Sequence, residues 1–565
     1  MKKTLWILLI FLGYQSFGQS ARQLPRNINN LAHNQVYPAV SGDGKVMLFM
    51  SDYSDDGAFA MMLSEYRAGK WQDPEDALII GSSKVNNWGG YSLNYDGTTV
   101  YFSSRRSEGI GKFDIWYSTY ADREWSRPKN IGKPINTSGN EGNPSVSPDG
   151  QRLYFMKCER MSTDDLGGCK LYYSEQGPRG WEEAVELPDY LNRGNSTSPR
   201  ILPDNKTLVF ASDRPGGKGG IDIWMTKRTG DHWSEPINVE AVNTAEDDLF
   251  LSATMRSIAY ITTTSDKGKK VIAELRLPEQ FRLENMIIRQ GTIKDQEGNS
   301  LAVEVRAYNL NEDTYEVRMR TSSATGAYIM ILPEGALYDV SYSEIRLNKL
   351  YHSELVDATD LVAPRREYPN LILQDIRQDA SFPLHVFGFK QFTSDIDLNS
   401  SMEISRLTRL LNQYPKLNIE ISAYQKNYLE DSIPSAEDLT ELRIDTLLAY
   451  EPAIRVDKMA SSQKDSLLYE INDVLSSTVL DTTLANTYLQ RMATLESVQV
   501  QKLSNIYHND RTIAQAESVR TRLIEKGIAD NRLQAVGYSD DIPSVEFPAG
   551  KDRMIVIRLL NEPQK

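Results

Sequence analysis

The sequence predicts a multidomain, largely β protein: an all-β propeller of about five blades, a small β-sandwich, and a C-terminal α/β domain with a helical insertion. The propeller rests on a periodic signal, because Trp71, Trp125, Trp181 and Trp233 follow one another at intervals of 54, 56 and 52 residues. Each tryptophan ends a sequence repeat that contains a turn and two short apolar runs. A period of this length, made of short strands, is typical of radially repeated β-sheets.

Each repeat begins with the residues of a tight turn. The turns are Gly42-Asp43-Gly44, Tyr95-Asp96-Gly97, Pro148-Asp149-Gly150 and Pro203-Asp204-Asn205. Such sequences join two strands, and the runs after them are rich in the β-branched and aromatic residues that strands favour. A fifth copy at 249–277 keeps the apolar run Ile258–Ile261 but has no tryptophan. We therefore expect five blades over 35–280, or a sixth if residues 24–36 add to the ring.

This repeated phrase resembles the TolB-type propeller repeat of bacterial envelope proteins, which implies an exported chain. The N-terminus agrees, because the charged start Met1-Lys2-Lys3 precedes an apolar stretch and the small residues of Ser16-Phe17-Gly18. We expect a signal peptide over 1–18 and an N-terminal segment over 19–34. The apolar stretch is about half of the roughly 20 residues that span a bilayer, and no later segment has transmembrane character. The expected location is the periplasm, in association with the outer membrane.

The charge balance bears on the choice of partner. The chain has 63 basic and 77 acidic residues and a formal net charge of −14. It shows no basic stripe, so nucleic acid is not an expected partner. The acidity itself favours solubility.

The only two cysteines, Cys158 and Cys169, flank a hairpin tip in the third repeat. Paired strands would bring them close together, and an oxidising periplasm favours a disulfide. Two free thiols are the alternative.

No sequence pattern indicates catalysis. There is no Gly-x-Ser-x-Gly elbow, the five histidines are scattered, and no His-x-x-x-His or Cys-x-x-Cys spacing suggests zinc. The glycine-rich stretch Pro215–Gly220 superficially resembles a phosphate cradle, but no helix follows it, so a turn between strands is expected. We expect no catalytic residue, no cofactor, no metal site and no enzyme activity.

A different β pattern occupies residues 287–373. Gly291–Gly298 combines a strand with a turn, and Val303–Tyr308 alternates as a half-buried strand does. The segment resembles the small β-sandwich related to carboxypeptidase regulatory domains. The resemblance implies a spacer or docking module.

Residues 380–561 change to an α/β pattern. The apolar positions of 401–411 share one helix face, and a second helix over 514–526 ends at Gly527. The expected strands are Leu384–Phe389, Leu417–Ile421, Arg532–Tyr538 and Met554–Ile557. An insertion at 428–508 separates the two halves; it is polar and helical in pattern, and it lacks the sustained heptad of a coiled coil.

Three sequence segments of this region resemble the peptidoglycan-binding C-terminal domain of the OmpA family. They are Tyr414–Ser422, Ala516–Ile528 and Asn531–Tyr538. That family holds the diaminopimelate of the stem peptide with an aspartate after the second strand and an arginine early in the following helix. A zwitterion needs one fixed anion and one bidentate cation, so the pairing is chemically sensible.

The corresponding positions of this sequence have lost both charged anchors. The positions are Tyr424, Lys426, Asn427, Gln515 and Arg553. Lys426 stands in place of the aspartate and cannot accept a hydrogen bond, and Gln515 stands in place of the arginine and carries no charge. Of the closing Asn-Arg-Arg, only Arg553 remains. Two expectations stay open: an envelope scaffold with little muropeptide affinity, or rewired muropeptide recognition.

The order of the domains resembles the PorE family, periplasmic accessories of the type IX secretion system in Bacteroidetes. Members usually have a helical-repeat domain and a lipid anchor before the propeller; we identify neither here and expect a divergent relative. The resemblance implies a scaffold that binds envelope proteins and, weakly, peptidoglycan. A peptidoglycan-binding tether or a periplasmic ligand sensor that uses the propeller channel are the alternatives.

Overall fold

The computed structural model describes residues 21–53, 59–77, 90–121, 123–162, 165–177, 179–390, 393–425, 439–452, 495–507, 511–538 and 553–563. The chain divides into two compact units, Met1–Asp375 and Ile376–Lys565. The expected signal peptide lies outside the described residues. In the part of the chain that is described, no helix has the length and apolarity needed to cross a membrane.

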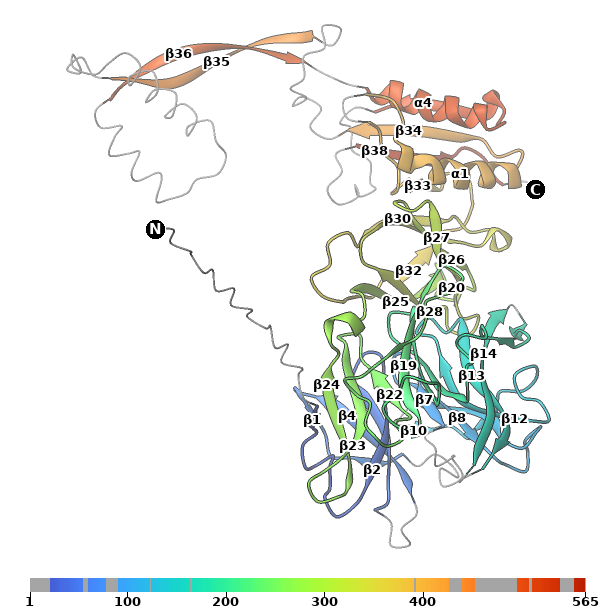
Figure 1. Cartoon of the computed structure of the whole chain (residues 1–565). Coiled ribbons are helices and arrows are strands. Elements are labelled where there is room, and N and C mark those ends of the chain that lie inside the picture. Colours follow the sequence, from blue (N-terminus) through green and yellow to red (C-terminus); the bar gives the residue numbers. More distant parts are fainter. Residues whose placement is uncertain are drawn as a thin grey trace, which may run out of the picture. The chain divides into compact units, whose positions relative to one another are not determined.

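The first unit begins with five antiparallel sheets that follow one another along the chain (Figure 1). The first contains β2 (Gln35–Val40), β3 (Val46–Ser51), β4 (Ala60–Arg67), β5 (Lys70–Trp71) and β6 (Glu75–Asp76). The second contains β7 (Tyr91–Leu93), β8 (Thr99–Ser104), β9 (Asp114–Ala121), β10 (Glu124–Trp125) and β11 (Lys129–Asn130). The third contains β12 (Asn140–Val146), β13 (Arg152–Met161), β14 (Leu166–Gly177), β15 (Gly180–Trp181) and β16 (Val185–Glu186). The fourth contains β17 (Ser196–Ile201), β18 (Thr207–Ser212), β19 (Asp222–Thr229), β20 (His232–Trp233) and β21 (Ile237–Asn238).

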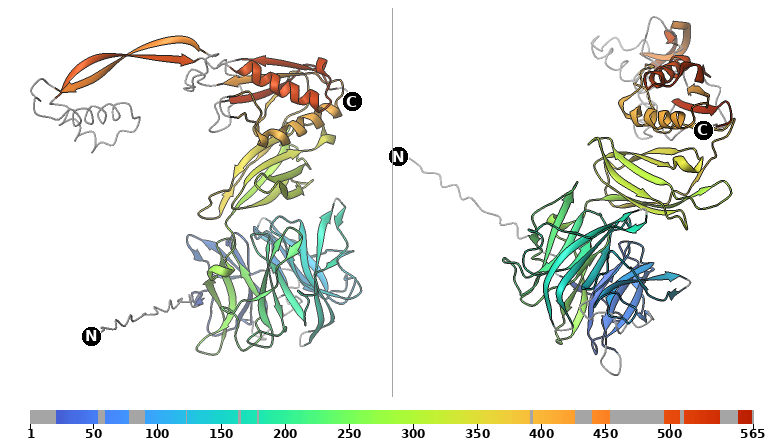
Figure 2. Two further views of the ribbon diagram at one scale, coloured as in Figure 1. Left: turned by 45° about the horizontal axis from the view of Figure 1, so that its top comes forward. Right: turned by 90° about the vertical axis from the view of Figure 1, so that its right-hand side faces the viewer.

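The fifth sheet closes the ring with a strand from the start of the chain. It contains β22 (Leu251–Ala253), β23 (Ile258–Thr264), β24 (Lys270–Arg276) and β1 (Arg22–Gln23). β1 pairs antiparallel with β24, and the fifth sheet lies beside the first, where Val40 N donates to Ser252 Oγ at 3.1 Å (Figure 2). The expected five blades are confirmed. Residues 24–36 form no sixth blade, because β1 completes the fifth sheet and β2 already begins the first.

The repeated turns explain why each blade folds. Gly44, Gly97 and Gly150 lie at φ +73°, +77° and +72°, a conformation that glycine adopts without steric cost. In each turn the preceding aspartate accepts hydrogen bonds from the backbone; Asp149 Oδ1, for example, accepts from Gln151 N at 3.0 Å. The turn chemistry that the sequence predicts is therefore confirmed.

A disulfide joins Cys158 of β13 to Cys169 of β14. The two residues face each other directly in the β13–β14 ladder, and both are buried. The bond therefore crosslinks the β13–β14 hairpin of the third blade.

Replacing both cysteines by serine is expected to destabilise the first unit by about 3 kcal/mol, because the bond restricts the unfolded chain over a short loop. Thermal unfolding with and without reductant measures the effect. Reductant should lower the melting temperature of the wild type and leave that of the double variant unchanged. Equal melting temperatures for the two proteins without reductant would contradict the prediction.

Two four-stranded sheets follow the propeller within the first unit. One contains β25 (Met286–Asp295), β28 (Ala327–Pro333), β31 (Arg365–Glu367) and β32 (Leu371–Leu373), and the other contains β26 (Glu304–Asn309), β27 (Thr314–Arg320), β29 (Leu337–Ser343) and β30 (His352–Asp357). Short 3-10 turns lie at Glu279–Phe281 and Ile345–Leu347. β25 is buried on both faces: Ile287 packs in the core between the two sheets, whereas Ile288 packs in a cluster shared with the propeller. These two sheets are called the sandwich below.

Among its described residues, the second unit contains a mixed four-stranded sheet and two helices. Its elements are β33 (Ser381–Pro383), a 3-10 turn (Leu398–Ser400), α1 (Ser401–Gln413), β34 (Ile419–Gln425), α4 (Thr512–Glu525), a 3-10 turn (Asp530–Arg532), β37 (Leu533–Gly537) and β38 (Arg553–Leu559). The strand order is β33-β38-β34-β37, with β34 and β37 parallel. The two expected helices are confirmed, and Gly527 takes φ +90° after α4. The strand expected at Leu384–Phe389 is wrong, because the chain leaves the sheet at Pro383 and turns.

The helical character expected for the insertion is wrong where the structure describes it. β35 (Leu439–Pro452) and β36 (Leu495–Tyr507) form a two-stranded antiparallel sheet (Figure 1). The physical reason is visible in the sequence, because Val498 and Val500 alternate with polar residues at the period of a strand. The remainder of 428–508 lies outside the described residues.

Candidate functional site

The propeller channel leaves little space beside the repeated turns. A cavity of about 30 Å³ lies on its axis, since residues from all five innermost strands line it. They include Val40, Leu93, Val146, Ile201 and Ala253. A cavity of this size holds about one or two water molecules, so this part of the channel has no room for the ligand of a small-molecule sensor.

The sandwich covers the propeller where its repeated turns lie. A guanidinium nitrogen of Arg366, in β31, lies 3.2 Å from Asp43 Oδ2 and donates to the hydroxyl of Tyr95 at 3.1 Å. Burial raises the pKa of Tyr95 well above its ordinary value, so the hydroxyl stays neutral. The buried apolar cluster that joins the two parts includes Met255, Ile288 and Ile331. The propeller and the sandwich therefore share one core.

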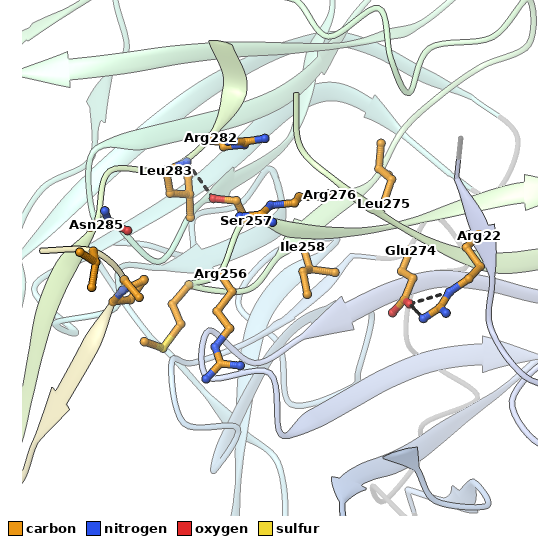
Figure 3. Close-up of a pocket in the computed structure, with 14 residues that line it drawn as sticks. Arg22, Arg256, Ser257, Ile258, Glu274, Leu275, Arg276, Arg282, Leu283 and Asn285 are labelled. Atoms are coloured by element: carbon orange, nitrogen blue, oxygen red, sulfur yellow. Dashed lines mark hydrogen bonds and ion pairs between the residues drawn. The ribbon is translucent and has the colours of Figure 1, made fainter. Parts of the chain in front are cut away.

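A groove of about 910 Å³ lies between the fifth blade and the sandwich (Figure 3). We call it the arginine groove, because three exposed arginines line it: Arg256, Arg276 and Arg282. Arg22, also in its wall, is ion-paired with Glu274, whereas no acidic side chain among the described residues pairs with the other three. Its apolar lining residues are Met255, Ile258, Leu275 and Leu283 of the propeller side and Val362, Ala363 and Pro364 of the sandwich side. The groove therefore combines apolar surface with unpaired positive charge in a chain whose net charge is −14.

Arg256 occupies a special place in the repeat. It belongs to the turn between β22 and β23, where the other four blades have Asp43, Asp96, Asp149 and Asp204. Those aspartates accept backbone hydrogen bonds within their turns. An arginine has no acceptor for that task, so its exposed guanidinium is available to the groove.

Four asparagines, three of them buried and Asn192 half-buried, hold the connections between blades, and the sequence motifs did not predict them. Asn136 Oδ1 accepts from Ile115 N at 2.8 Å, and its Nδ2 donates to Ile115 O at 2.9 Å. The same pairing joins Asn192 to Leu171, Asn243 to Ile223 and Asn29 to Ile272. Each amide thus satisfies both backbone groups of a residue in the third strand of a blade. The repeated pair Asn136-Thr137 and Asn243-Thr244 is the signal that could have revealed this pattern.

Two carboxyl groups follow these asparagines by five residues: Glu141, which is buried, and Asp248, which is half-buried. Burial raises the pKa of Glu141 and of Asp248. Each accepts from the backbone N–H and the hydroxyl of a threonine four residues earlier, Thr137 and Thr244 respectively. These acids therefore stabilise the connections between blades.

The glycine-rich stretch Pro215–Gly220 is confirmed as a turn between β18 and β19. Lys218 N donates to Asp222 Oδ1 at 3.0 Å, and Gly219 N donates to Asp222 Oδ2 at 3.1 Å. The N–H groups that a phosphate would need are thus already bonded to a carboxylate of the chain.

In the second unit, the three expected peptidoglycan positions that the structure describes, Tyr424, Gln515 and Arg553, lie on two strands of one sheet and on a helix. Tyr424 is in β34, and its ring stacks on Tyr538 with centroids 5.0 Å apart. Arg553 begins β38, opposite Gln425. Lys426 and Asn427 lie outside the described residues.

Gln515 is buried in the first turns of α4 and is 1% exposed. Its Nε2 lies 3.4 Å from Thr393 O, so the loop before α1 covers it. Its Oε1 and the Oε1 of Gln425 are buried without a hydrogen-bond partner among the described residues. Gln515, which corresponds to the ligand-binding arginine of the OmpA family by resemblance, is therefore buried below the surface of the described structure.

Comparison with known proteins gives matches of fold only. No protein-family model and no curated protein matches the chain. A structure assigned as TolB from Agrobacterium tumefaciens matches with 16% identity and TM-score 0.27, over 53% of this chain and 90% of its own. TolB from Acinetobacter baumannii matches with 13% identity and TM-score 0.29, over 52% and 65%. An α-L-arabinofuranosidase from Podospora anserina matches with 12% identity and TM-score 0.27, over 46% and 97%.

The expectation that the chain has no enzyme activity is contradicted by this comparison. Besides the TolB structures, the matches include α-L-arabinofuranosidases and a protein described as a glycoside hydrolase, so we withdraw that exclusion. The lack of a nucleophile elbow and of zinc-ligand spacing in the sequence bears only on other classes of enzyme. Glycoside hydrolysis uses a pair of carboxylates, which have no fixed spacing in a sequence.

Proposed function

We propose that the chain is a periplasmic protein of the bacterial cell envelope and acts there as a scaffold, in association with outer-membrane or type IX secretion machinery. The observation that carries this proposal is the distribution of space in the first unit. Beside the repeated turns, which the sandwich covers, the axial cavity has only about 30 Å³, whereas the arginine groove on the outside has about 910 Å³. Such a surface suits the docking of another protein, because apolar area and arginine are both favoured at interfaces.

Cross-linking in living cells tests this proposal. Wild-type chain and an Arg276→Ser, Arg282→Ser variant would be compared, with Arg105→Ser, Arg179→Ser as a control that removes two exposed arginines from other blades. We expect the wild type and the control to cross-link to the same envelope protein and the groove variant to lose most of that product. Identical products from all three proteins would remove the groove from the proposal, and recovery of cytoplasmic partners alone would refute the envelope role.

The second unit adds a testable expectation about the cell wall. We propose that it is an OmpA-like domain whose muropeptide site has lost its anchors, and the burial of Gln515 supports this view. Wild-type protein should sediment little with purified peptidoglycan sacculi, and a Lys426→Asp, Gln515→Arg variant should sediment more. The melting temperature of the variant must be measured as well, since Gln515→Arg places a charge at a buried position. Strong sedimentation of the wild type that free muropeptide abolishes would instead support rewired peptidoglycan recognition.

A further inference from the structure

A separate cleft of about 530 Å³ lies between the propeller and the sandwich. The turns of the second and third blades form its propeller wall, and β25, β27 and β28 form its sandwich wall. We call it the tyrosine cleft, because Tyr101, Tyr328 and Tyr368 line it. Its volume falls in the range of small-molecule sites, roughly 300–1,000 Å³, and it shares no lining residue with the arginine groove.

Ion pairs between the propeller and the sandwich hold the two walls of the tyrosine cleft in place. Arg366 of the sandwich lies 3.2 Å from Asp43 of the first blade, and Lys206 of the fourth blade lies 3.2 Å from Glu316 of β27. The second and third blades, which form the cleft, follow the first and precede the fourth along the ring. Since the propeller and the sandwich also share one apolar core, the cleft is already formed in the folded chain, as ligand sites usually are.

Two side chains of the tyrosine cleft have hydrogen-bond donors to offer. Asn370 Oδ1 accepts from Thr292 N at 3.0 Å, which fixes the orientation of the amide, and Asn370 Nδ2 has no partner among the described residues. The hydroxyl of Tyr101 likewise has no partner in the described structure, and it is not a buried atom. A ligand in the cleft can therefore accept from the Asn370 amide and both donate to and accept from the Tyr101 hydroxyl.

Two glutamines of the tyrosine cleft offer acceptors. Gln151 Nε2 donates to Asp149 O at 3.2 Å, and Gln290 Nε2 donates to Asp96 Oδ2 at 3.5 Å. These bonds fix both amides and leave the Oε1 atoms of Gln151 and Gln290 without a partner among the described residues. The cleft thus presents donors and acceptors together.

Aromatic and apolar groups form the rest of the lining. The Tyr368 side chain is 60% exposed at the rim, where its ring can stack on a ligand. The Tyr328 ring is buried, and its hydroxyl bonds within the sandwich, to Pro369 O at 3.3 Å. Met319 and Ile329 add apolar surface. An exposed tyrosine ring packs well against a flat face of C–H groups.

The charged residues of the tyrosine cleft are already engaged within the protein. Among the described lining residues, the only cation is Arg320, which pairs with Glu344. Asp96 and Asp149 accept backbone hydrogen bonds in their own turns. An anionic ligand would therefore meet two carboxylates and no free cation, so the cleft favours a neutral ligand.

We propose that the tyrosine cleft binds a neutral saccharide. Sugar hydroxyls both donate and accept, so they match the free groups of Tyr101, Asn370, Gln151 and Gln290, and the C–H face of a sugar ring packs on the exposed ring of Tyr368. The site goes beyond the proposed scaffold function and does not depend on it, because a different set of residues carries each.

An array of neutral oligosaccharides, with oligogalacturonates as the anionic comparison, tests the site on the full chain, and calorimetry then measures the strongest neutral binder. Tyr101→Phe removes one hydroxyl and should weaken binding by about two- to tenfold. Tyr368→Ala removes the exposed ring and should weaken it by about tenfold. Tyr117→Phe is the matched control and should bind as the wild type does, because Tyr117 faces Tyr101 across the β8–β9 pair but does not line the cleft.

Hydrogen exchange of the wild type keeps the proposal testable even if a variant fails to fold. The bound oligosaccharide should slow exchange in residues 147–151 and 290–292 and leave residues 273–276, at the arginine groove, unchanged. Three results would each overturn the proposal: no neutral member of the array binds, only the oligogalacturonates bind, or the cleft variants bind the neutral oligosaccharide as tightly as Tyr117→Phe does.

Discussion

Replacing Asn29 by alanine is expected to open the propeller ring and to lower the free energy of unfolding of the first unit by about 3–5 kcal/mol. Asn29 is buried; its Nδ2 donates to Ile272 O at 2.8 Å and Leu24 O at 3.0 Å, and its Oδ1 accepts from Ile272 N at 2.9 Å. Alanine leaves two backbone groups, Ile272 N and Leu24 O, without these partners in the interior, each at a cost of about 1–3 kcal/mol, whereas Ile272 O keeps the bond from Leu24 N. The segment that Asn29 anchors also positions β1, which completes the fifth blade.

Calorimetry measures the predicted loss of stability of the Asn29→Ala variant, and hydrogen exchange measures the predicted opening of the ring. The melting transition of the first unit should shift down, and the amide protons of residues 22–24 should exchange faster. Asn30→Ala is the matched control, since Asn30 is the exposed neighbour of Asn29. Asn243→Ala should cost a similar free energy but leave the exchange of residues 22–24 unchanged, because it removes the same pairing from a connection that does not close the ring. Normal exchange at 22–24 in the Asn29 variant would show that the ring closes without this contact.

These asparagines show what the sequence allows one to predict and what it does not. The blades could be predicted because Asp-Gly turns and flanking apolar runs are local signals that recur together. Ring closure depends instead on a contact between Asn29 and Ile272, which are far apart in the chain. A single asparagine has no local preference that identifies its partner, so its role emerges only when the third strand of the blade is in place.

The second unit illustrates a different limit on what can be predicted from the sequence. Its helices follow from apolar periodicity, and α1 and α4 lie where the sequence places them. The segment around Val498 contains apolar residues at a helical spacing, such as Met492 and Leu495, and also a strand-like alternation, and local pattern cannot decide between the two. The resemblance to the OmpA family assigned Gln515 to the ligand site from its place early in the helix. Its burial beneath Thr393 depends on how distant segments of the chain pack together, and the local sequence does not reveal that packing.

Replacing Arg289 by alanine is expected to destabilise the sandwich by about 3 kcal/mol or more. Arg289 lies on β25 with its side chain only 4% exposed, on the same face as the core residue Ile287. It bridges the two sheets, because it contacts Glu354 of β30 at 2.9 Å and Glu367 of β31 at 3.1 Å. Removing the cation leaves two partly buried carboxylates without their counter-charge, which typically costs about 3–5 kcal/mol for a fully buried pair.

A double-mutant cycle separates the ion pair from the packing of the arginine stem. Arg289→Met keeps apolar volume in the core, and combining it with Glu354→Gln removes one of the uncompensated charges; the double variant should therefore be more stable than Arg289→Met alone. Arg320→Ala is the control, because Arg320 pairs with Glu344 at the surface and a pair of that kind contributes about 0–1 kcal/mol. If Arg289→Ala and Arg320→Ala unfolded at the same denaturant concentration, the two sheets would be held together by their apolar core alone.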